Sequence, residues 1–135
     1  MRYILFFFLS FSFFISNGQT TQGPKNGAVI GFPITSHDFG DIIQGDKVSF
    51  VFKYKNTGTE PLIINEVLTT CGCTATEWSK TPLAPGEIGS LSASFNSEGK
   101  MGRQNKVITI LSNATNNAAT ISLVCNVLPS ANSTK

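Results

Sequence analysis

Apolar and polar residues alternate with a period of two through most of this chain, which is the pattern of half-buried β-strands. In "KVSFVFKYKN", Val48, Phe50, Phe52 and Tyr54 share one face, while polar side chains dominate the other. Four further segments show strand-like patterns, namely 61–69, 90–96, 106–113 and 120–128. No helical period of useful length interrupts them, so the chain is predicted to be all-β.

Turn-forming residues separate these segments at regular intervals. Gly-Asp pairs at 40–41 and 45–46, and the stretches 56–61, 84–87 and 97–102, combine Gly, Pro, Asn and Asp. About seven short strands with regularly spaced turns predict an antiparallel Ig-like β-sandwich. Three glycines are expected to serve the reversals: Gly40 and Gly45 allow two turns, and Gly58 is expected to adopt a positive φ.

The first eighteen residues read as a signal peptide. Arg2 precedes an apolar run from Tyr3 to Ile15, and Ser16 and Gly18 are small residues that suit cleavage before Gln19. The run is too short to cross a hydrocarbon core of roughly 30 Å as a helix. No cysteine follows it, which argues against a lipoprotein anchor. We expect export to the periplasm, the cell surface or the medium, with an uncleaved anchor as the alternative.

Composition sets the remaining boundaries. Residues 19–28 are polar and rich in Gly and Pro and are predicted to form a linker, 29–128 the sandwich, and 129–135 a disordered tail.

The charges of the chain are few and scattered. Without the first eighteen residues there are nine Lys and Arg and eight Asp and Glu. Binding to nucleic acid needs clustered cations, so a nucleic-acid partner is not expected. Membrane insertion after cleavage is not expected either, because no other segment is long and apolar.

Two stretches carry a family resemblance. "HDFGDIIQGDKVSFVFKYKNTGTEPLIINEVLTTCGCT" and "LAPGEIGSLSASFNSEGKMGRQNKVITILSNA" contain an Asp-Phe-Gly start, an Asn-Thr-Gly turn and a Cys-Gly-Cys. Over about residues 34–127 the chain resembles a family of exported bacterial domains of unknown function. That family is in turn similar to Ig-like domains of the major sperm protein, ASH and Hydin type. The resemblance implies a seven-stranded sandwich with a binding or structural role, and it brings no catalytic residues.

The three cysteines differ in context. Cys125 shares a strand face with core residues and is expected to be a buried thiol, with pairing to Cys71 or Cys73 as the alternative. Gly72 gives the chain the freedom for a Cys71–Cys73 disulfide, which export permits. The pair could instead bind Cu(I), with His37 as a third ligand. Catalytic thiol exchange is not expected, because no helix follows to lower a cysteine pKa.

Other catalytic patterns are missing from the sequence. There is no G-x-S-x-G, no phosphate-binding glycine loop and a single histidine, so the protein is not expected to be an enzyme. The candidate binding residues lie in and after the Cys-Gly-Cys: Thr70, Cys71, Gly72, Cys73, Thr74 and Trp78. Trp78 would either cap the core or anchor an unidentified protein partner. The leading hypothesis is a protein-interaction or structural module; the alternative is a thiol redox or Cu(I)-binding protein.

Overall fold

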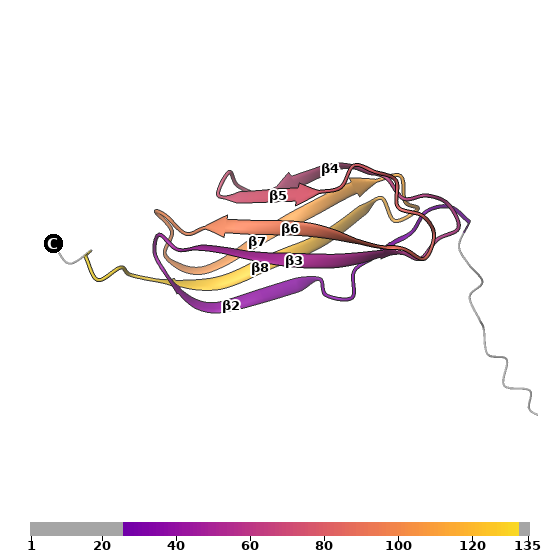
Figure 1. The fold of residues 1–135 in the computed structure, drawn as a ribbon. Coiled ribbons are helices and arrows are strands. Elements are labelled where there is room, and N and C mark those ends of the chain that lie inside the picture. Colours follow the sequence, from indigo (N-terminus) through magenta and orange to yellow (C-terminus); the bar gives the residue numbers. More distant parts are fainter. Residues whose placement is uncertain (1–25, 133–135) are drawn as a thin grey trace, which may run out of the picture.

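The computed structural model describes residues 26–132, which form a sandwich of two four-stranded sheets (Figure 1). The first sheet has the order β1 (Ile30–Gly31), β3 (Lys47–Asn56), β6 (Ile88–Asn96) and β5 (Thr74–Trp78). The second has the order β2 (Ser36–Ile43), β8 (Ala118–Leu128), β7 (Gly102–Ser112) and β4 (Ile64–Thr69). The predicted Ig-like β-sandwich is confirmed. The predicted signal peptide lies outside the described residues.

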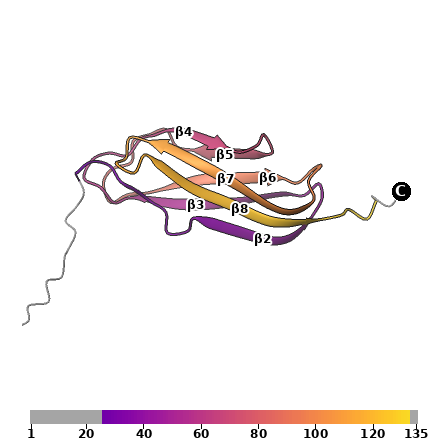
Figure 2. The same cartoon turned by 180° about the vertical axis from the view of Figure 1, so that it is seen from behind.

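One pair of strands departs from the antiparallel prediction. β1 pairs antiparallel with β3 at only two positions, and the chain then crosses to the other sheet, where β2 pairs parallel with β8. Figure 2 shows β2 beside β8 along one side of the molecule. Pro33 lies in the crossing and has no N–H to continue a ladder. The first strand is therefore split between the sheets. Nowhere in residues 26–132 is there a helix that could cross a membrane.

The core lies between the sheets and follows the period-two pattern. The predicted inner face of β3 points inward, with Phe52 and Tyr54 buried and Val48 and Phe50 half-buried. The largest fully buried apolar side chains come from strands of both sheets and, for Leu62, from the segment before β4, namely Phe52, Phe95, Leu62, Leu91, Ile108, Ile110, Ile121, Leu123 and Val127. Each apolar strand face thus packs against the facing sheet.

The boundary between linker and domain needs a correction. Ala28, assigned above to the linker, is 2% exposed and belongs to the hydrophobic core. The N–H of Gly27 donates a hydrogen bond to Thr59 Oγ1, 3.0 Å away. The backbone is therefore held against the domain before residue 29, and packing rather than composition sets the boundary. At the other end the structure describes the chain to Asn132, with a turn at Ala131 and Asn132.

Asn56 organises the end of the sandwich where Asn26 lies. Its side chain is fully buried, and its Nδ2 donates to the carbonyl oxygens of Glu60 and Leu83 at 2.7 and 2.9 Å. Its Oδ1 accepts from the N–H groups of Gly58 and Val29 at 3.0 and 3.4 Å. One amide therefore joins the start of the domain, the turn after β3 and the loop before β6.

Gly58, in the Asn-Thr-Gly turn, is required for a different reason than the positive φ expected from the sequence. Gly58 does not have a positive φ, whereas Gly40 and Gly45 do, with φ of 71° and 98°. A Cβ at Gly58 would instead overlap the carbonyl oxygen of Gly27 and the backbone nitrogen of Val29. Glycine stands there because two backbone segments approach closely, and sequence alone does not distinguish this from a turn requirement.

Replacing Asn56 by Ala should destabilise the fold by about 3–5 kcal/mol, because it leaves several buried backbone groups without partners. Urea denaturation followed by tryptophan fluorescence measures this loss. Asn117→Ala is the matched control, because Asn117 is exposed and lies at the same end; its cost should stay within about 0.5 kcal/mol. Equal stabilities for the two variants would contradict the role given to Asn56.

Candidate functional site

The Cys-Gly-Cys forms a corner between the two sheets. β4 ends in one sheet with Thr69 opposite Ile108, and β5 begins in the other with Thr74 opposite Phe95. Residues 70–73 make this crossing at the end of the sandwich where β8 also ends (Figure 1). Cys71 and Cys73 lie at disulfide-bonding distance, with Cα atoms 5.3 Å apart. The predicted pairing is the one that the structure contains.

Backbone hydrogen bonds hold this corner from both sides. The carbonyl oxygen of Cys71 accepts from Thr69 Oγ1 at 3.2 Å and from the N–H of Thr74 at 3.4 Å. The carbonyl oxygen of Cys73 accepts from the N–H of Asn96 at 2.9 Å, which ties the corner to β6. Thr74 Oγ1 also lies 3.8 Å from Cys71 Sγ. The corner is therefore a fixed shape and not a loose loop.

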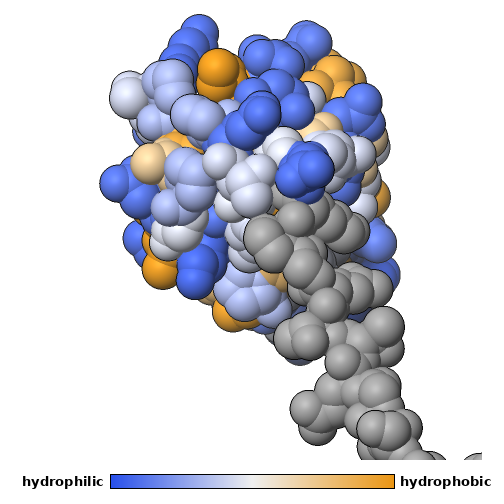
Figure 3. Space-filling model, turned by 90° about the vertical axis from the view of Figure 1, so that its right-hand side faces the viewer, coloured by the Kyte–Doolittle hydropathy of each residue, from blue (hydrophilic) through white to orange (hydrophobic). Residues whose placement is uncertain are grey.

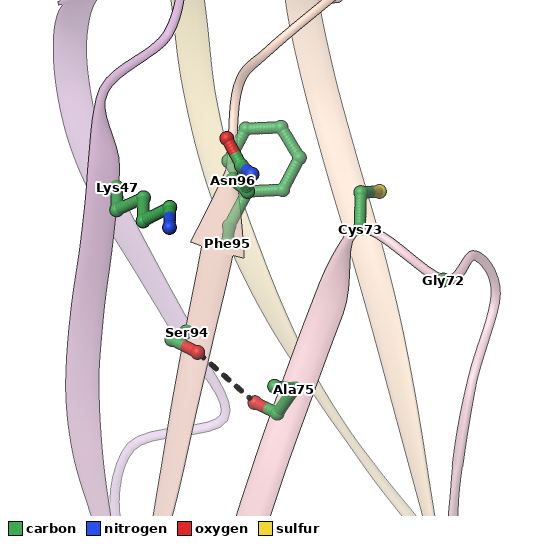
Figure 4. A pocket seen from close by; sticks show the side chains of 7 residues that line it. All are labelled: Lys47, Gly72, Cys73, Ala75, Ser94, Phe95 and Asn96. Atoms are coloured by element: carbon green, nitrogen blue, oxygen red, sulfur yellow. Dashed lines mark hydrogen bonds between the residues drawn. The ribbon is translucent and has the colours of Figure 1, made fainter.

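A shallow hollow of about 240 Å³ lies beside the corner (Figure 4). Its lining residues are Lys47, Gly72, Cys73, Ala75, Ser94, Phe95 and Asn96. Ser94 Oγ donates to the carbonyl oxygen of Ala75 at 3.5 Å across the floor, and Lys47 extends from β3 on the opposite side. Of these residues, only Gly72 and Cys73 are among the binding residues expected from the sequence. No local signal could have found Lys47, because the pairing of β3 with β6 places it opposite Asn96.

Trp78 does not belong to the corner. It is the last residue of β5, five residues beyond Cys73, which corresponds to about 16 Å along an extended strand. Its ring is half-buried and packs against the core, and its Nε1 is buried without a hydrogen-bond partner among the described residues. The structure thus favours the core-capping alternative for Trp78. Thr74, also expected among the binding residues, is 7% exposed, so the candidate surface contracts to residues 70–73.

His37 is far from the cysteines in the fold. It lies in β2, at the opposite edge of the sheet from β4. Its ring stacks on Phe50, with centroids 3.8 Å apart, and meets Phe39 edge-on at 4.6 Å. Within residues 26–132 no three His, Cys, Asp or Glu side chains gather in a way that could hold a metal ion. The structure therefore does not bring His37 together with Cys71 and Cys73.

Cys125 behaves as its strand pattern predicts. It is 2% exposed, faces the core from β8 and is free, so it does not pair with Cys71 or Cys73. Burial raises the pKa of its thiol, because the low-dielectric surroundings disfavour the thiolate. This residue is a core side chain and contributes no chemistry to the corner.

Replacing both Cys71 and Cys73 by Ser should leave a cooperatively folding sandwich. The disulfide closes a very short loop, so its removal should cost no more than about 1–2 kcal/mol, and the core side chains lie elsewhere. Thermal unfolding followed by circular dichroism checks this. The prediction fails if the double variant loses its cooperative transition.

Cys125 should resist alkylation in the native, oxidised protein. Because burial raises the thiol pKa, the reactive thiolate is scarcer at every pH than for an ordinary cysteine. Iodoacetamide labelling followed by intact mass should show no fast adduct at pH 8, one adduct after denaturation and three after denaturation with reduction. Rapid labelling of Cys125 in the folded protein would contradict its burial.

Comparison with known proteins agrees with this fold. The structure is similar to a protein of unknown function from Porphyromonas gingivalis W83, with a TM-score of 0.65 and 18% identity over 81% of this chain and 51% of that one. It is also similar to the ASH/PapD-like domain 7 of human CEP192, with a TM-score of 0.64 and 10% identity over 88% and 99% of the two chains. The predicted relation to ASH-type domains is confirmed at the level of fold.

A third similar structure is the secreted serine protease VesC from Vibrio cholerae, with a TM-score of 0.56 and 17% identity over 77% of this chain and 24% of that one. The chain thus spans about half of the P. gingivalis protein and a quarter of the protease, and these likenesses concern the fold alone. None of the curated proteins compared with the chain matches it. Residues 30–127 match the family described as protein of unknown function DUF1573, and the chain belongs to that family.

Proposed function

We propose that this domain is an exported, non-enzymatic module that binds another protein of the cell envelope through its Cys-Gly-Cys corner. The surface is residues 70–73 together with the hollow beside Cys73; Thr74 is 7% exposed and is not part of it. Export rests on the sequence of the first eighteen residues, and the non-enzymatic role rests on the ASH-like fold and on the chemistry of the corner. The partner is a protein because the hollow is shallow and shared by three strands.

The observation that carries this proposal is a fixed, exposed corner that the core does not require. Thr70 and Gly72 are exposed and Cys71 and Cys73 are half-buried, while the large buried side chains come from the strands. A disulfide and three backbone carbonyl contacts hold the corner in one shape. A surface ordered in advance loses less conformational entropy when a partner binds.

The corner lacks the groups that catalysis would need. Lys47 is the single ionisable residue among those lining the hollow, since the cysteines are joined. A general acid or base must lie within hydrogen-bond reach of the proton that it transfers, and Lys47 is the one side chain of the hollow that could act in this way. The likeness to a secreted protease covers a quarter of that protein and supports a shared domain architecture without transferring its activity. Protein binding therefore fits the corner better than a reaction does.

Export is tested by the mass of the protein recovered from the envelope fraction of the native cell. Cleavage before Gln19 should remove residues 1–18 and leave a chain that begins with Gln. A full-length mass in the cytoplasm would contradict export, and a full-length mass in the membrane fraction would support the uncleaved anchor.

Partner binding is tested by placing a photo-crosslinking residue at Thr70 and, as control, at Asn117, an exposed position at the other end of the sandwich. Irradiation of intact cells should give a discrete adduct from position 70 and none from 117. The Cys71→Ser, Cys73→Ser background should weaken that adduct, because the corner loses its fixed shape. Identical adducts from both positions would show that the corner is not a specific surface.

A further inference from the structure

The split of the first strand leaves one long strand edge open. β1 covers β3 only at Lys55 and Asn56, and the chain then departs to the other sheet. Among the described residues no strand pairs with this side of β3 from Lys47 to Tyr54. Figure 1 shows β3 running along the side of the sandwich beside β2, to which it is not hydrogen-bonded. An exposed strand edge is a template for pairing with another chain.

The direction of the backbone groups follows from bonds at the end of β3. The N–H of Thr57 donates toward β1, to the carbonyl oxygen of Val29, whereas the N–H of Asn56 donates toward the loop before β6. Because backbone direction alternates along a strand, the odd-numbered residues turn their N–H and C=O groups to the open edge. These residues are Lys47, Ser49, Val51 and Lys53.

The inner side of this edge is apolar and incompletely covered. Val48, Phe50, Phe39 and His37 are all half-buried, although they pack against or near the core. They come from β3 and from β2, which face one another across the side of the sandwich. A strand added to β3 would place every second side chain against this seam. The seam therefore favours an incoming strand with apolar residues at alternate positions.

An apolar hollow of about 360 Å³ lies where such a strand would meet β1. It is lined by Gly31, Phe32, Pro33, Lys53, Lys55, Thr57 and Ile88. Ile88 is 65% exposed, and Gly31 contributes no side chain to fill the space. Figure 3 shows that apolar surface at the neighbouring end of the molecule occurs as small patches among hydrophilic residues. A partner would thus be held by backbone pairing and charge more than by a broad apolar face.

The charge on the outer side of this edge selects the partner. Lys47, Lys53 and Lys55 are exposed on β3, and none forms an ion pair among residues 26–132, where the one salt bridge joins Arg103 and Asp38. Lys53 Nζ donates only to a neutral hydroxyl, that of Ser90, at 2.7 Å. Opposite charges on neighbouring strands stabilise their pairing. The edge is therefore complementary to an acidic strand.

The same charges disfavour a second copy of this chain. An antiparallel pairing of two β3 edges centred on Phe50 would set Lys47 opposite Lys53 of the copy. Centred on Val51, it would set Lys47 opposite Lys55. Like charges directly opposite one another destabilise a strand pair, so self-pairing is the less favourable use of the edge.

We propose that the open edge of β3 binds an extended segment of another protein whose acidic and apolar residues alternate. The segment runs antiparallel to β3 in line with β1, with carboxylates toward the lysines and apolar side chains on the seam. This surface meets the hollow beside the Cys-Gly-Cys corner only at Lys47, and β6 lies between β3 and β5. The lysines changed in the test below, Lys53 and Lys55, do not line that hollow. Binding at the edge of β3 does not depend on the function proposed for that corner.

The probe is a capped, fluorescent heptapeptide, Glu-Val-Thr-Val-Thr-Val-Glu, and its control has Lys at each Glu. Its two Glu residues have the same spacing as Lys47 and Lys53 on β3. Fluorescence anisotropy with the full chain should show saturable binding of the acidic peptide alone. Lys53→Glu with Lys55→Glu should weaken it about tenfold, because attraction becomes repulsion opposite Lys53 and at the neighbouring Lys55, which itself pairs with Gly31 of β1. Lys80→Glu, an exposed lysine beyond the far strand of the same sheet, should change the affinity less than twofold.

Amide hydrogen exchange distinguishes strand pairing from non-specific electrostatic attraction, because only strand pairing protects particular backbone amides of β3. Binding should protect the amide protons of Ser49, Val51 and Lys53, because these become ladder donors. Equal binding of the two peptides, protection elsewhere, or no binding of the acidic peptide at about 1 mM would overturn the proposal. If the acidic peptide does not bind and the Lys53→Glu, Lys55→Glu variant self-associates, the proposal is also overturned. The lysines then serve only to keep the edge of β3 from pairing with a second copy.

Discussion

A single buried amide closes one end of this sandwich. Asn56 satisfies backbone groups from the start of the domain, the turn after β3 and the loop before β6, and Gly58 lets these segments approach. Ser97 has the corresponding role at the other end, where its single hydroxyl proton is shared between the carbonyl oxygens of Ile43 and Asp46, 3.0 and 2.9 Å away. Since buried backbone groups without partners are costly, these two polar side chains fix the loops that the strands alone would leave open.

Because the ends and the core are held in this way, the core needs little from the corner: Cys73 packs against its margin and Thr74 is buried, while Thr70 and Gly72 are exposed. The disulfide and backbone contacts of the corner give an exposed segment a defined shape without burying large side chains. Cys125, by contrast, is a core residue whose burial raises its thiol pKa. Cys71 and Cys73 thus determine the shape of a surface loop, whereas Cys125 is a packed side chain of the core.

The split first strand has a consequence on the opposite side of the molecule. Pro33 accompanies the move of the chain from β3 to β8, and β1 remains only two residues long. The edge of β3 is left open, with lysines outside and half-buried aromatic rings inside. The two candidate surfaces therefore arise from crossings between the sheets, one before β2 and the other before β5.

The sequence by itself determined the fold class, the inward face of β3, the burial of Cys125 and the nearness of Cys71 to Cys73, because these depend on period-two alternation and on short spacing. It missed β5, since Thr74 and Thr76 point inward where apolar residues signal a strand. It also missed β2, because the turn expected at Gly40-Asp41 is an irregularity within that strand, where the register shifts between Asp38 and Asp41. Only the tertiary structure decided the parallel pairing of β2, the burial of Ala28, the reason for Gly58, and the separation of His37 and Trp78 from the cysteines. Each of these depends on which distant segments lie side by side. The local sequence pattern does not predict which distant strands pair.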